Sequence, residues 1–163
     1  MATLDGTDAR LLVGATALSA LVLPVVGFAT LPDAPFDVTA STVVPLLLAM
    51  AGFLVMMLFV DPVLTPKRVN TSNDVQVWLS KTVMARLPVT EIPVLVGLLI
   101  AVADRERGVL LIGAFGTLVL ATVWWPGEQF FNAMRRRLQP MRADHLVDEL
   151  LNSTNNRLFL RTR

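Results

Sequence analysis

Residues 38–60 read VTASTVVPLLLAMAGFLVMMLFV and contain no charged side chain over 23 positions. A helix rises about 1.5 Å per residue, so about 20 apolar residues cross the hydrocarbon core of a bilayer. Residues 11–31 and 108–127 are two further uncharged stretches, of 21 and 20 positions. The sequence therefore predicts an all-α integral membrane protein, which agrees with 54% apolar and only 17% charged residues in a chain of 163.

A fourth, weaker span is predicted over residues 87–103, which contain Glu91 and two prolines. Its uncharged part, residues 92–103, covers only 12 positions, so a re-entrant or interfacial segment is the alternative. Four spans place twelve of the 14 Lys and Arg residues on one side of the membrane. Because positive residues concentrate in cytoplasmic loops, this count predicts that both termini are cytoplasmic. The bias toward Arg, Ala, Val and Leu is typical of bacterial proteins, so we expect the bacterial inner membrane.

Residues 71–87, between the second and third spans, are predicted to form an amphipathic helix. Thr71 is a suitable N-cap, Asp74 follows three residues later, and Pro88 is expected to end the helix. Apolar side chains recur along one face of this segment at helical spacing. The stripe fits either the surface of the cytoplasmic leaflet or a partner subunit.

The four-span membrane domain is expected over residues 1–139, followed by a basic helical tail over residues 140–163. The three arginines directly after the last span attract anionic lipid head groups, although they also serve as a simple topology signal. Near the end of the tail, residues 157–161 have three apolar side chains between two arginines. This pattern is typical of a segment that pairs with another part of this chain or with another chain. The residues expected at a partner or lipid interface are Trp78, Leu79, Val83, Arg135, Arg136, Arg137, Leu158, Phe159 and Leu160.

Chemically reactive residues are scarce. The chain has no cysteine and a single histidine, His145, so no cofactor or metal site and no enzyme activity are expected. Asp61 ends the second span and Glu91 begins the third, on the same side of the membrane. Two acids that face each other at one depth would share a proton or bind a cation, whereas separate acids are ordinary water-facing boundary residues.

We therefore expect a non-catalytic accessory subunit that docks on larger membrane subunits through its spans, amphipathic helix and tail. The host would be a respiratory enzyme or a multi-subunit lipid transporter, and no nucleic acid is expected as a partner. Two features motivate this hypothesis: no buried ionisable pair is evident, and the apolar stripes lack an obvious partner in so small a chain. The alternative is a small homo-oligomeric transporter or channel with Asp61 and Glu91 along the ion path. A lipid-modifying enzyme is the weakest hypothesis, because such enzymes gather several His, Asp or Glu side chains.

Overall fold

The computed structural model describes residues 6–31 and 40–152, and these residues form helices and short connections without any strand. The first three long segments are α1 (Gly6–Thr30), the unbroken run of α2 (Ala40–Val55), η1 (Met56–Val60) and α3 (Asp61–Leu64), and α4 (Ser72–Asp104). They are followed by α5 (Arg107–Val123), α6 (Glu128–Leu138), the 3-10 turn η2 (Gln139–Met141) and helical residues 145–152.

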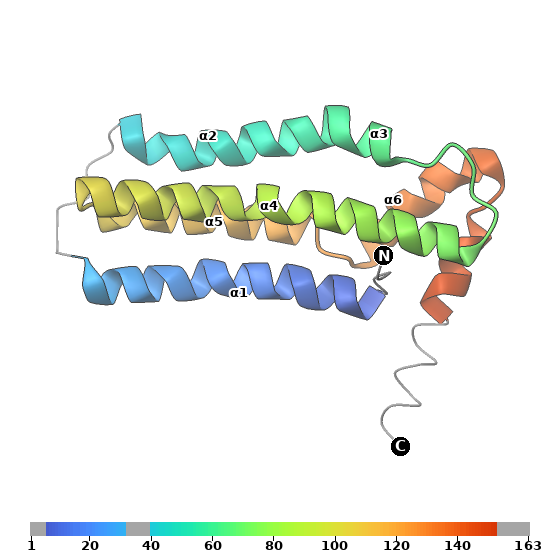
Figure 1. The fold of residues 1–163 in the computed structure, drawn as a ribbon, viewed down its shortest axis with the longest axis horizontal. Helices are drawn as coiled ribbons and strands as arrows, with labels where there is room; N and C mark the ends of the chain where they lie inside the picture. The colour runs from blue at the N-terminus through green and yellow to red at the C-terminus, as the bar shows by residue number, and fades with distance from the viewer. Residues whose placement is uncertain (1–5, 32–39, 153–163) are drawn as a thin grey trace, which may run out of the picture.

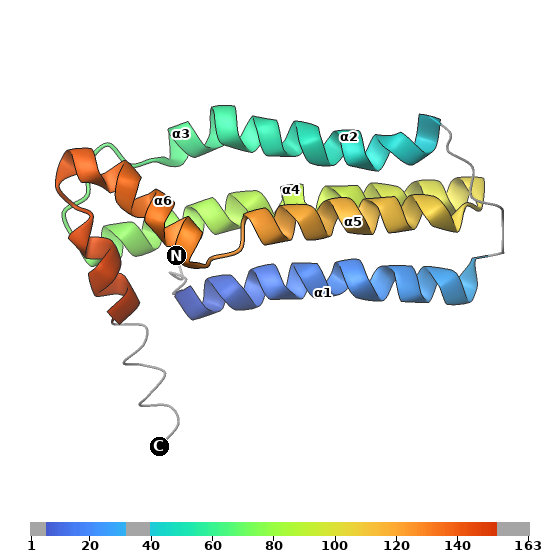
Figure 2. The same cartoon turned by 180° about the vertical axis from the view of Figure 1, so that it is seen from behind.

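The helices α4 and α5 form the centre of the bundle, and α1 and α2 lie on opposite sides of this pair (Figure 1). Each of the two outer helices contacts both central helices. Successive long segments run in opposite directions, as both views show (Figure 2). At one end of the bundle lie α6, residues 139–152 and the α4 residues 72–86, and we call this set the head. The start of α1 and the end of α5 lie at the same end (Figure 1).

Three helical segments are long and apolar enough to cross a membrane: Asp8–Thr30, Ser41–Leu64 and Ser72–Asp104. The helix α5 has 17 residues and passes the same test only together with Glu128–Met141, from which it is bent by 53°. The described residues therefore contain three to four candidate spans, as a multi-pass membrane protein requires. The sequence predicted residues 87–103 as the weakest span and residues 108–127 as a strong one. In the structure, residues 87–103 belong to the longest helix, α4, whereas residues 108–127 contain α5, the shortest of the four candidate spanning helices.

The prediction that Pro88 ends the amphipathic helix is wrong. The helix α4 continues for 33 residues with Pro88 and Pro93 inside it. Its predicted start is confirmed, because the Asp74 backbone N–H donates to the Thr71 hydroxyl at 3.2 Å and the Asp74 carboxylate accepts from the Thr71 N–H at 3.0 Å.

The helix continues past the prolines because one packing face runs along its whole length. Proline removes a backbone hydrogen bond, but packing of neighbouring helices makes this loss tolerable in membrane proteins. The amphipathic segment and residues 87–103 therefore form one continuous helix (Figure 1). The buried residues recur at helical spacing on both sides of Pro88: Val75, Trp78, Leu79, Thr82, Val83, Thr90, Pro93, Val94, Gly97 and Ala101.

Two glycines let the backbones of α4 and α5 approach each other closely. A Cβ atom at Gly97 would lie 3.0 Å from the Val109 carbonyl oxygen and 3.2 Å from the Gly113 Cα. A Cβ atom at Gly113 would overlap the carbonyl oxygen of Pro93. Small residues at a helix crossing allow this close packing. In a bilayer, where lipid tails are as apolar as the helix surface, van der Waals contacts of this kind hold helices together.

We expect Gly113→Ala to lower the free energy of unfolding by about 1–3 kcal/mol, because the new methyl group meets backbone that cannot rotate away. The matched control is Gly14→Ala on α1, where a Cβ atom would meet only the Trp125 ring at 3.9 Å. Thermal unfolding of both variants in detergent measures the effect. Equal stability of the two variants would contradict the close crossing.

Candidate functional site

Asp61 is positioned by an irregular turn at the head end of the second span. Its backbone N–H donates to the Met56 carbonyl five residues back, which closes the π-helix η1. A π-turn holds an additional residue per turn, and such turns are frequent at functional sites. This local change sets the direction of the Asp61 side chain, which is only 1% exposed.

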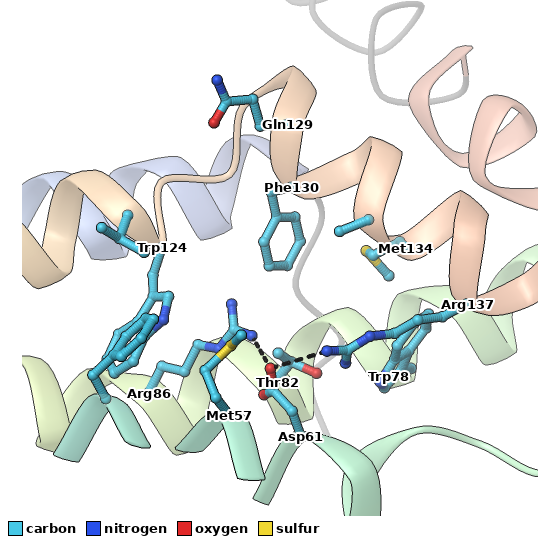
Figure 3. Close-up of a pocket in the computed structure, with 13 residues that line it drawn as sticks. Met57, Asp61, Trp78, Thr82, Arg86, Trp124, Gln129, Phe130, Met134 and Arg137 are labelled. Atoms are coloured by element: carbon cyan, nitrogen blue, oxygen red, sulfur yellow. Dashed lines mark hydrogen bonds and ion pairs between the residues drawn. The ribbon is translucent and has the colours of Figure 1, made fainter. Parts of the chain in front are cut away.

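Two arginines from different helices face the Asp61 carboxylate (Figure 3). The Arg86 Nη2 on α4 lies 2.5 Å from the Asp61 Oδ2, and the Arg137 Nη2 on α6 lies 3.4 Å from the same oxygen. Arg137 also donates to the Thr65 hydroxyl at 3.5 Å. Because one carboxylate faces two guanidinium groups, this cluster carries an unbalanced positive charge.

The Arg86 side chain is held between aromatic rings and is 12% exposed. Its guanidinium carbon lies 5.5 Å from the ring centroids of both Trp124 and Phe130. The Trp124 ring in turn stacks on Phe53, with centroids 6.2 Å apart and planes 19° apart. Cation–π contacts of this kind contribute about 0.5–2 kcal/mol each, so Arg86 is fixed by packing as well as by charge.

These residues line a pocket of about 280 Å³ between the bundle and the head. Five buried side-chain polar atoms lack a hydrogen-bond partner within the described residues, and four of them belong to residues that line this pocket. They are Asp61 Oδ1, Trp78 Nε1, Thr82 Oγ1 and Arg86 Nε. A buried polar atom without a partner costs about 1–3 kcal/mol, so this concentration indicates a pocket built for a polar group.

The structure does not bring Asp61 and Glu91 face to face, and the expectation that Asp61 is a water-facing boundary residue is wrong, because its side chain is 1% exposed. The Glu91 Oε1 accepts a 3.5 Å hydrogen bond from the Thr16 hydroxyl of α1, whereas Asp61 lies on the α2 side of the bundle. Positions 86 and 91 differ by about 140° around a helix of 3.6 residues per turn, so Glu91 points elsewhere than Arg86. The expectation that the chain has no buried ionisable pair is also wrong, because Asp61 and Arg86 form one.

The structure places Trp78, Leu79 and Val83 inside the head, where each is buried. They belong to one hydrophobic cluster with side chains of α1, of α6 and of residues 145–152. The expectation that the apolar stripes find no partner within the chain is therefore wrong. Three segments, each amphipathic by itself, bury their stripes against one another.

The three consecutive arginines of α6 have different surroundings. Arg135 donates to Asp148 at 2.6 Å and to Asn132 at 2.5 Å, so it fastens residues 145–152 to α6. Arg136 is exposed, and only Arg137 reaches the pocket. The remaining predicted interface residues, Leu158, Phe159 and Leu160, lie outside the described part of the chain.

Sequence reasoning missed the pocket, although a signal for it exists. Trp78, Thr82 and Arg86 are spaced by four residues, so their polar ends share one face of α4.

Comparisons of the chain with protein-family models, with curated proteins and with solved structures find no match. Groups of three or more His, Cys, Asp or Glu side chains suited to a metal ion are also not found among residues 6–31 and 40–152.

We expect Asp61→Asn to lower the free energy of unfolding by about 3–5 kcal/mol, because it leaves buried Arg86 without a counter-charge. Replacing the pair together, Asp61→Leu with Arg86→Met, should restore most of the loss, since no uncompensated buried charge remains. Unfolding in detergent, analysed as a double-mutant cycle, measures this coupling.

The control for this cycle is the pair Arg135 and Asp148, whose side chains are 31% and 57% exposed. Asp148→Asn should cost less than about 1 kcal/mol, as exposed ion pairs do. A coupling between Asp61 and Arg86 no larger than the control would show that the buried pair does not hold the head to the bundle.

Proposed function

We propose that this chain is a non-catalytic accessory membrane protein whose pocket binds the anionic head group of a lipid. The observation that supports the proposal is the set of buried, unpaired polar atoms beside two arginines. A purely structural ion pair needs only one cation for each carboxylate, and here the second cation lies at the pocket wall.

A phosphate or carboxylate group fits the donors that line the pocket. Trp78 Nε1, Thr82 Oγ1 and Arg86 Nε each supply a proton, and none has a partner within the described residues. Arg137 adds a guanidinium group that is only partly buried. Hydrogen bonds to a charged group contribute about 1.5–3 kcal/mol each, so a bound anion satisfies the donors and balances the unpaired charge.

The remaining unpaired atom gives the pocket a preference among head groups. Asp61 Oδ1 accepts hydrogen bonds but has no donor within the described residues. A head group that carries its own hydroxyl or ammonium next to the phosphate supplies that donor, as glycerol and ethanolamine do. Choline, with a fully methylated nitrogen, does not. We therefore expect phosphatidylglycerol and phosphatidylethanolamine to bind more tightly than phosphatidylcholine.

The position of the pocket agrees with a lipid ligand. Met57 and Val123 are exposed apolar residues on its bundle side, while Gln129 and Arg137 lie on its head side. Within residues 6–31 and 40–152, Lys67, the arginines of α6 and most other positive residues lie toward the head end. On the positive-inside rule we infer a cytoplasmic head, with the pocket at the inner leaflet of a bacterial inner membrane.

Docking on a larger membrane complex is the second part of the proposal. The span Ser41–Leu64 has only 17% of its apolar window buried, against 28% for the other two long spans. Its outer face therefore offers the most free surface for a neighbouring subunit. A lipid transporter is the host that agrees best with a lipid-binding pocket. Purification from native membranes in mild detergent tests this part, and a particle that holds only this chain would contradict it.

We expect Arg137→Gln to weaken phosphatidylglycerol binding by about tenfold or more, the loss of one charge-assisted contact. Thr82→Val keeps the shape of the side chain and removes one donor, so it should weaken binding about two- to tenfold. Native mass spectrometry of the purified protein, titrated with the lipid in detergent, measures the affinities.

The matched controls are Arg136→Gln, the exposed neighbour on α6, and Thr122→Val, an exposed threonine on α5 outside the pocket. Both should bind as the wild type does. Equal losses in pocket and control variants would indicate general attraction between basic residues and the membrane and would overturn the site.

A further inference from the structure

An apolar groove of about 230 Å³ lies between α2 and α5, and only apolar residues line it. Phe53 and Val123 line both this groove and the polar pocket, so the two hollows meet at these side chains. From Phe53 the groove runs back along α2 as far as Leu46. Seven residues of helix correspond to about 10 Å, so the groove extends from the pocket toward the middle of the span.

We propose that this groove seats an acyl chain of the same lipid whose head group occupies the pocket. The inference rests on the proposed function and names the ligand as a whole amphiphile. Positive charge and unpaired donors surround the polar pocket, and the groove that adjoins it at Phe53 and Val123 has a wall without polar side chains. This is the charge pattern of a phospholipid, with an anionic head and an apolar chain.

The shape of the groove supports the same occupant. Its floor is made of small residues, because a Cβ atom at Gly116 would lie 3.3 Å from the Ala49 Cβ and 3.2 Å from the Pro93 Cβ. Its rims are exposed apolar side chains, among them Met50 and Phe115. Small residues below and large ones at the sides leave a narrow groove, into which a flexible chain fits.

The groove also distinguishes a lipid from a free anion. Inorganic phosphate or glycerol phosphate uses only the polar pocket, whereas a lipid uses both parts. A variant that fills the groove should therefore weaken lipid binding and leave binding of the small anion unchanged. Val119→Phe is such a variant, because Val119 is 44% exposed at the rim of the groove.

The experiment titrates the full-length protein with three probes: dioleoyl-phosphatidylglycerol, dihexanoyl-phosphatidylglycerol and glycerol 3-phosphate. Native mass spectrometry in detergent gives the affinity for each. We expect Val119→Phe to weaken binding of the dioleoyl lipid about tenfold, equivalent to roughly two methylene groups leaving the groove. Binding of glycerol 3-phosphate should not change. The matched control is Val22→Phe on α1, a valine 48% exposed on the opposite side of the bundle.

Met50→Trp provides a second way to fill the groove if Val119→Phe does not fold, as judged by size-exclusion chromatography. If the groove variants bind the dioleoyl lipid as tightly as Val22→Phe does, the groove does not hold the acyl chain, even if Arg137→Gln still weakens binding. That outcome would leave the groove to a neighbouring helix. A wild-type protein that binds none of the three probes would instead overturn the head-group proposal itself.

Discussion

A buried carboxylate at the end of a membrane span is the constraint on which the rest of the structure depends. Asp61 is 1% exposed, and such a charge persists in a protein only when it is paired. Its partners come from α4 and α6, so the ion pairs tie the second span, the central helix and the head into one unit. The hydrophobic cluster of the head then closes over the same region of α4.

The same arrangement explains why a pocket exists at this place. Two cations around one anion leave positive charge, and the four-residue spacing along α4 puts further donors beside it. The aromatic rings that hold Arg86 also line the pocket. Close packing through Gly97 and Gly113 fixes α5 against α4, and α2 meets this pair along the small floor residues. A polar pocket beside an apolar groove follows from these contacts together.

The spans were predictable because uncharged stretches of bilayer length, such as residues 38–60, have few alternative structures in a folded chain. The start of α4 at Thr71 was predictable because a capping box is a local signal. The passage of α4 through Pro88 was not, since it depends on packing partners far away in the sequence. The Asp61–Arg86 pair was missed for the same reason: their 25-residue separation carries no local signal, and the π-turn that directs Asp61 has no sequence signature of its own.

The most direct test of the account is the indole N–H signal of Trp78, recorded by nuclear magnetic resonance on ¹⁵N-labelled protein in detergent micelles. Trp78 Nε1 is one of the unpaired donors of the pocket, whereas Trp125 is exposed and serves as an internal reference. Addition of phosphatidylglycerol should shift the Trp78 signal, and phosphatidylcholine should shift it much less. A Trp78 signal that responds to both lipids no more than the Trp125 signal would contradict binding of an anionic head group in this pocket.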